Sequence, residues 1–107
     1  MAVNREAIRA LVDQLQRQPF PTGSGDEVVG GLHADLAEYD GHVTGILSQL
    51  ASKGKAPWPL ERDAALRKAI EAAARSGVEP RAHDAQRLLA YLDTLDEVLR
   101  AVNILAE

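Results

Sequence analysis

Apolar residues recur at alternating intervals of three and four between positions 29 and 50. They are Val29, Leu32, Leu36, Tyr39, Val43, Ile46 and Leu50. Because this spacing follows the 3.6-residue turn of an α-helix, it predicts a single apolar seam along one side of a helix. The opposite side carries almost only small residues: Gly30, Gly31, Ala34, Ala37, Gly41, Thr44, Gly45, Ser48 and Ala51. The pattern therefore predicts one face that fills a core and another that lets a second surface approach closely.

Three further segments show helical periodicity, and Pro and Gly residues separate them. The predicted helices cover 4–18, 25–53, 59–76 and 80–105. Short connections favour antiparallel neighbours, so we expect an all-α fold, an antiparallel (up-down) four-helix bundle or helical assembly with two short and two long helices. No linker separates two core-sized blocks, and we expect a single domain over 1–107.

The expected helix ends follow from residues with known capping preferences. Asn4 and Ser24 are expected as N-cap residues, Pro59 and Pro80 in first turns, and Gly54 and Gly77 as the stops after two helices. The long helices would exceed the short ones by roughly 12–18 Å. In a monomer, part of their apolar seams would then stay uncovered, as at an interface. This predicts a homodimer through the two long helices, with another protein as the alternative partner.

Composition narrows the classes of protein. The chain has 107 residues, of which 46% are hydrophobic and only 4% aromatic, and this favours helices over a β-sandwich. Cysteine is absent, which excludes disulfides and thiol nucleophiles and agrees with a cytoplasmic location. We expect no cleaved signal and no membrane span, because no apolar run approaches 18 residues. The net charge of −4, with interleaved acids and bases, counts against nucleic-acid binding.

The small face of the second predicted helix supplies the main interface candidates: Gly41, Gly45, Ala34 and Ala37. A glycine inside a helix costs roughly 1 kcal/mol relative to alanine, which indicates a steric need on that face. We expect close packing there, against another helix of this chain or against a second copy. The alternative is that the glycines at 30 and 31 mark only a kink or a late helix start. Trp58, framed by prolines, is either a partner anchor or a lid over one end of the bundle.

Candidate chemistry is sparse. Asp35, Glu38 and His42 share one edge of the second predicted helix, and such groups bind metal ions in helical bundles. However, the second Glu-x-x-His pair of di-metal bundles is missing, so these three residues are weak metal candidates and a solvated edge is the favoured interpretation. The carboxylates at 93, 96 and 97 form an acidic cluster, for which Arg100 offers a balancing charge. No nucleophile or phosphate-binding loop accompanies them.

The sequence therefore predicts a non-enzymatic protein–protein interaction or regulatory module without a cofactor, such as an adaptor or immunity-type protein. The alternative is a helical bundle that binds a metal ion or small ligand. A third possibility is a non-catalytic domain whose partner is encoded beside it.

Overall fold

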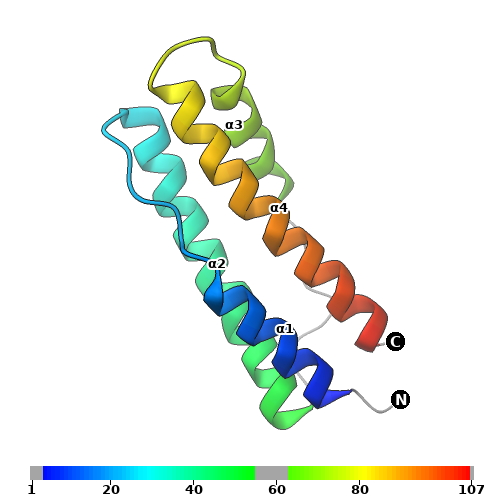
Figure 1. The fold of residues 1–107 in the computed structure, drawn as a ribbon. Helices are drawn as coiled ribbons and strands as arrows, with labels where there is room; N and C mark the ends of the chain where they lie inside the picture. Colours follow the sequence, from blue (N-terminus) through cyan, green and yellow to red (C-terminus); the bar gives the residue numbers. More distant parts are fainter. Residues whose placement is uncertain (1–3, 55–62, 107) are drawn as a thin grey trace.

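The computed structural model describes residues 4–54 and 63–106, with side chains described up to residue 102. Four helices make up the fold: α1 (Arg5–Arg17), α2 (Glu27–Lys53), α3 (Ala64–Ala74) and α4 (Arg81–Ala106) (Figure 1). The predicted all-helical bundle is confirmed, and the part of the chain described contains no strand. The helices have 13, 27, 11 and 26 residues, so two are short and two are long.

Helix α1 begins and helix α2 ends as expected, but the start of α2 differs. The side chain of Asn4 accepts a hydrogen bond from the backbone N–H of Ala7 at 3.1 Å. Gly54, with φ of 73°, ends α2 in the left-handed conformation that glycine adopts without strain. Ser24 does not cap α2, because Asp26 accepts from the N–H of Val29 at 3.1 Å. The Ser24 hydroxyl accepts instead from the N–H of Asp26, and it donates to α4.

Helix α3 is shorter than predicted at both ends. Its N-cap is Asp63, whose carboxylate accepts from the N–H of Leu66 at 2.9 Å, so α3 begins at Ala64. Position 59, the predicted start, lies outside the described residues. The helix ends at Ala74, and Gly77 follows with a φ of 72°. Pro80 directly precedes α4, whose first residue is Arg81.

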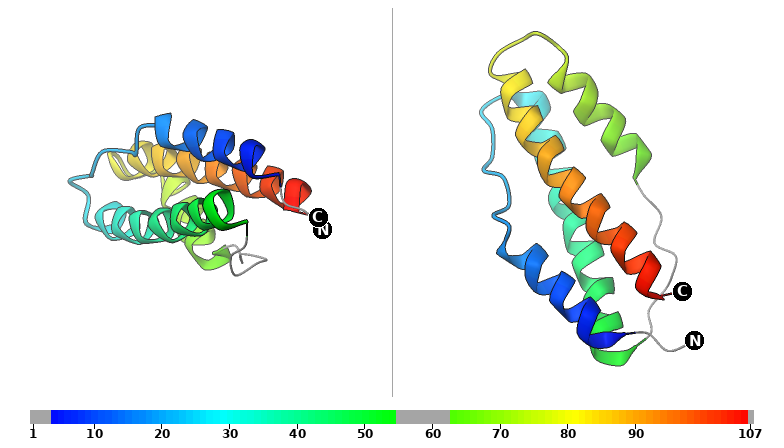
Figure 2. Two further views of the ribbon diagram at one scale, coloured as in Figure 1. Left: turned by 90° about the horizontal axis from the view of Figure 1, so that it is seen from below. Right: turned by 45° about the vertical axis from the view of Figure 1, so that its right-hand side comes forward.

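The two short helices lie along different halves of the α2–α4 pair (Figures 1 and 2). Helices α1 and α3 each contact both long helices but do not contact each other. Consecutive helices run in opposite directions in Figure 1, so α2 and α4 run parallel side by side. Arg5 donates to the carbonyls of Ser52 and Lys53, which places the start of α1 against the end of α2. The molecule is therefore elongated, with extents of 48 × 23 × 17 Å.

This placement contradicts the predicted overhang of the long helices. Each short helix covers one part of the long pair, because the segment 18–26 carries the chain along α2 before that helix starts (Figure 1). The residues of α4 that recur at intervals of three and four are all buried: Ala85, Leu88, Leu92, Leu95, Leu99 and Val102. The α2 seam is buried too, except for Leu32, which is half-buried against the core. Helix length therefore gives no reason for dimerisation, and the homodimer stays a prediction.

Candidate interaction surface on helix α2

Most of the small residues of α2 lie on its outer side. The exposed ones, called here the small-residue strip, are Gly31, Ala34, Ala37, Gly41, Gly45 and Ser48. The apolar seam of α2 faces α1, α3 and α4, so helical periodicity turns the strip toward solvent. Ala51 departs from the prediction. It is buried, and its carbonyl accepts a hydrogen bond from Arg9 of α1.

The glycines of the strip have no steric role within the described chain. A Cβ atom added at Gly31, Gly41 or Gly45 would meet no heavy atom within 4 Å. The expected close packing against another helix of the same chain is therefore not present at these positions. Gly30 and Gly31 lie inside α2, which begins at Glu27, so they do not mark a late helix start. Close packing against a second molecule is the part of the prediction that stays open.

A groove runs beside the strip, between α2 and α3. It has a volume of about 470 Å³, and its walls combine apolar and acidic side chains. Its lining residues are Leu32, Asp35, Glu38, Tyr39, His42, Asp63, Ala65, Leu66 and Ala69. The three weak metal candidates on α2 thus share one wall, as their spacing predicted. The opposite wall comes from α3, which the pattern of α2 alone could not indicate. We call this feature the α2–α3 groove.

The described residues of the groove do not form a cluster of metal ligands. Within residues 4–54 and 63–106, no group of three or more His, Asp or Glu side chains is placed to hold a metal ion. Asp35, Glu38 and His42 are exposed, whereas the Asp63 carboxylate caps α3. In the described structure, Asp35, Glu38 and His42 therefore form a polar wall of a partly apolar groove.

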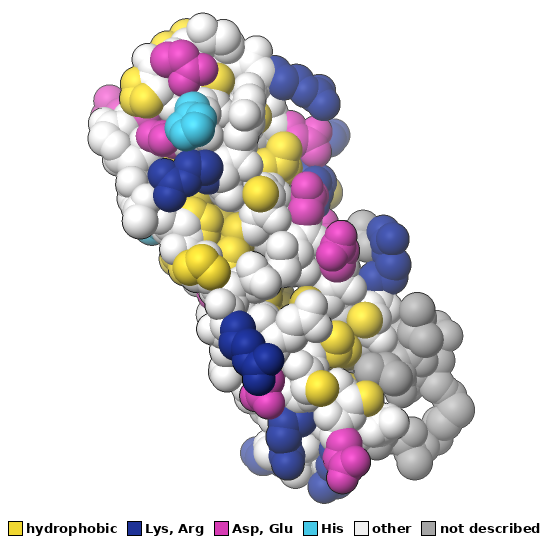
Figure 3. All heavy atoms as spheres, viewed as in Figure 1, with side chains coloured by type: hydrophobic (Ala, Val, Ile, Leu, Met, Phe, Trp, Pro, Cys, Tyr) yellow, Lys and Arg dark blue, Asp and Glu magenta, His cyan; other side chains and the backbone are white. Residues whose placement is uncertain are grey.

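The charge of α2 is one-sided. Between residues 27 and 52 the sequence contains four carboxylates, Glu27, Asp35, Glu38 and Asp40, but no Lys or Arg. Asp40 is used internally, because it accepts a hydrogen bond of 2.7 Å from the hydroxyl of Tyr91. No ion pair neutralises Asp35 or Glu38 among the described residues. The outer face of α2 is therefore acidic. By contrast, Lys and Arg side chains are interspersed with Asp and Glu on the face seen in Figure 3.

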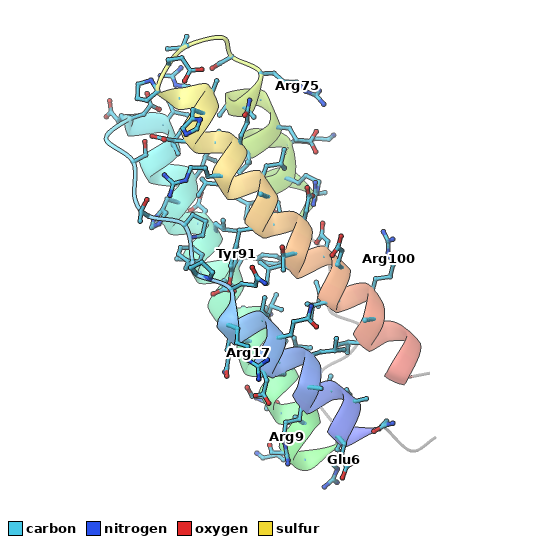
Figure 4. All side chains as sticks on the ribbon, in the orientation of Figure 1. Glu6, Arg9, Arg17, Arg75, Tyr91 and Arg100 are labelled. Carbon is cyan, nitrogen blue, oxygen red and sulfur yellow. The ribbon has the colours of Figure 1, made fainter. Side chains whose placement is uncertain are left out.

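An aromatic cluster secures the segment 18–26 against the long helices. The ring of Phe20 makes edge contacts with His33 of α2 and Tyr91 of α4, at centroid distances of 5.1 and 5.0 Å. Nε2 of His33 lies 2.8 Å from the carbonyl oxygen of Pro21. Tyr91 lies between α4 and α2 (Figure 4), and burial together with the hydrogen bond to Asp40 raises the pKa of its hydroxyl. A phenol held neutral in this way supports structure and is a poor general base.

Two of the three carboxylates of the acidic cluster of α4 pair with Arg67, a residue that the sequence pattern did not link to them. Arg67 of α3 donates to Asp93 at 2.9 Å and also to Asp96. Burial works against the charge of this guanidinium, but the hydrogen bonds to both carboxylates outweigh burial and raise the pKa of Arg67. Arg100, the expected balancing charge, points away from the helices in Figure 4. The cluster is thus an ion-paired joint between α3 and α4.

Three further findings limit the functional interpretation. Among the residues described, none of the helices has the length and apolar character needed to cross a membrane. Trp58, the remaining interface candidate, lies outside the described residues. Comparison of the chain with family models, curated proteins and solved structures gave no match.

Proposed function

We propose that this chain is a non-catalytic protein-interaction module that binds its partner along the outer face of α2. The observation that carries the proposal is the set of exposed glycines inside a regular helix. Gly31, Gly41 and Gly45 together weaken α2 by about 3 kcal/mol relative to alanine. No contact within the described chain requires them. A partner that approaches the backbone of α2 closely would give these glycines a steric purpose.

The dimensions of the strip suit a partner helix. From Gly31 to Ser48 the strip runs about 26 Å along α2 at 1.5 Å per residue. Small residues along this length let a second helix come closer than the usual 8–10 Å between helix axes. The occupant is either a second copy of the chain, as the homodimer prediction has it, or a different protein.

The non-catalytic part of the proposal rests on how the titratable groups are used. The carboxylates of Asp93 and Asp96 pair with Arg67, and Asp40 accepts from a tyrosine that stays protonated. Asp35, Glu38 and His42 remain free to exchange protons, but they are exposed on the groove wall, and the sequence offers no nucleophile to act with them. The cytoplasmic location belongs to the same proposal and is supported by the absence of cysteine.

Site-specific photo-crosslinking tests the proposal. A photoreactive amino acid at Gln49, an exposed position beside the strip, is compared with the same amino acid at Gln86, an exposed position on α4. We expect one discrete cross-linked species from position 49, either a dimer of the purified chain or a complex formed in the native cell. We expect none from position 86.

A second substitution ties the cross-link to the strip. Gly41→Leu has room for its Cβ atom and should leave α2 folded by circular dichroism. The cross-link from position 49 should then disappear, because the leucine side chain keeps the partner away from the backbone. A cross-link that survives Gly41→Leu, or equal cross-linking from both positions, would overturn the proposal.

A further inference from the structure

We infer that the α2–α3 groove, with the adjoining strip, binds a basic amphipathic helix of another protein. This inference rests on the proposed function and goes further by naming the chemistry of the partner. Three features carry it: the apolar floor of the groove, the carboxylates on both of its walls, and the absence of Lys and Arg between residues 27 and 52.

The floor and walls of the groove match an amphipathic helix. Leu32, Leu66 and Ala69 offer apolar surface, and the volume of about 470 Å³ falls in the range of about 300–1,000 Å³ that is usual for binding clefts. Asp35 and Glu38 stand on the α2 wall, three residues apart and therefore on the same side of the helix. A partner helix can place aliphatic side chains on the floor while its Lys or Arg side chains reach these carboxylates.

Some acids outside the groove are paired within the chain, whereas others, such as Asp13 and Glu97, form no ion pair among the described residues. Asp26 pairs with Arg81, and Asp93 and Asp96 pair with Arg67. In contrast, Asp35 and Glu38 form no ion pair among the described residues and are exposed. Charge complementarity therefore favours a cationic occupant, since it would supply the cations that the chain itself does not place there.

The same charges count against a second copy as the occupant. A two-fold axis brings identical surfaces together, so α2 would meet another α2. With no Lys or Arg between residues 27 and 52, Asp35 and Glu38 would face an equally acidic surface. Juxtaposed like charges weaken association, whereas a basic helix turns the same carboxylates into ion pairs.

Designed peptides test the inference without knowledge of the natural partner. An 18-residue helical peptide of Leu and Lys is compared with a Leu and Glu peptide that has leucine at the same positions. Fluorescence anisotropy at two salt concentrations gives the Kd of each for the full chain. We expect the Lys peptide to bind, with weaker binding at higher salt, and the Glu peptide not to bind.

Matched variants locate the binding. Asp35→Asn with Glu38→Gln should raise the Kd of the Lys peptide about 2- to 30-fold, as expected for two exposed ion pairs. The control, Asp13→Asn with Glu97→Gln, removes the same charge from exposed positions outside the groove. It should leave the Kd nearly unchanged. Ala69→Arg, which obstructs the groove, should weaken binding, whereas Ala72→Arg on the same helix should not.

The outcomes separate this inference from the proposed function. Equal binding of both peptides, or equal effects of the groove and control variants, would overturn the basic partner. Failure of the Lys peptide to bind while Gln49 still cross-links to a second copy would overturn it too, but would leave the interaction module standing. Absence of both peptide binding and the cross-link would overturn both proposals.

Discussion

The double substitution Gly41→Ala with Gly45→Ala offers a sharp test of how α2 is built. Both glycines lie inside α2, and a Cβ atom at either one meets no heavy atom of the described chain within 4 Å. The new methyl groups therefore have no clash to relieve and no cavity to fill. In the isolated monomer, the change should act only through helix propensity and the reduced freedom of the unfolded chain.

The expected gain follows from that geometry. Each substitution stabilises a helix interior by about 0.8–1.0 kcal/mol, so the pair should raise the free energy of unfolding by about 2 kcal/mol. For a domain of this size, 1 kcal/mol corresponds to about 4–8 °C in Tm. We expect Tm to rise by about 8–16 °C in thermal melts followed by circular dichroism at low protein concentration.

A third glycine provides the matched control. A methyl group at Gly77 would also meet no heavy atom of the described chain within 4 Å, but the φ of this residue is 72°. Gly77→Ala forces an L-residue into the left-handed region, which costs roughly 1–2 kcal/mol. The same chemical change should therefore lower Tm at position 77 and raise it at positions 41 and 45.

The result that would refute this reasoning is an unchanged or lower Tm for the double variant at low concentration. That outcome would mean that the glycines are needed within the monomer. If the strip instead joins two copies, the Tm of the wild-type protein should rise with concentration by mass action. The double variant should then lose part of that concentration dependence.

Three further substitutions test the contacts that hold the helices together. Asp26→Asn should destabilise the fold at pH 7 but much less at low pH. The hydrogen bond from Val29 and the pairing with Arg81 lower the Asp26 pKa from 3.8, so the stabilisation by this carboxylate is lost as pH falls through the folded pKa. Urea titrations from pH 2 to 7 measure the stability of both proteins. Tyr91→Phe should cost about 1–2 kcal/mol at pH 7. Because burial and Asp40 raise the Tyr91 pKa from 10.0, wild-type stability should decline more steeply than that of the variant above pH 10, in urea titrations carried out from pH 7 to 12. Arg67→Met should cost about 1–2 kcal/mol in thermal melts, with a smaller difference at high salt.

The helices were predictable because their signals are local. The alternating spacing of the α2 seam, the Asn4 cap and the stops at Gly54 and Gly77 each depend on a few neighbouring residues. The seam, the Asn4 cap and the Gly54 stop appear in the structure, whereas α3 ends at Ala74, before Gly77. The sequence predicts Ser24 as the N-cap of α2, but the N-cap is Asp26. Both residues have side chains that can accept a hydrogen bond from a helix N-terminus. In the structure the Ser24 hydroxyl donates a hydrogen bond to Asp84, which lies 60 residues away in the sequence.

The placement of the short helices could not be predicted for a similar reason. It depends on the segment 18–26, which contacts residues far away in the sequence. Phe20 packs against Tyr91, and Thr22 accepts a hydrogen bond of 2.9 Å from Arg87. Local periodicity contains no information about these pairs. It also could not show that α3 supplies the second wall of the groove opposite Asp35 and Glu38.

The sequence of α2 satisfies two requirements that the structure now separates. Its seam is needed for folding, since Leu36 and Val43 are fully buried. The small-residue strip is not needed for folding, because alanine at Gly41 and Gly45 would give a more stable helix with no clash. The unpaired acids at the edge of the strip are equally unnecessary for folding. Both departures from the most stable α2 occur on the same outer face, as expected if that face binds a partner. Stability and partner binding should therefore change in opposite directions when the strip is filled.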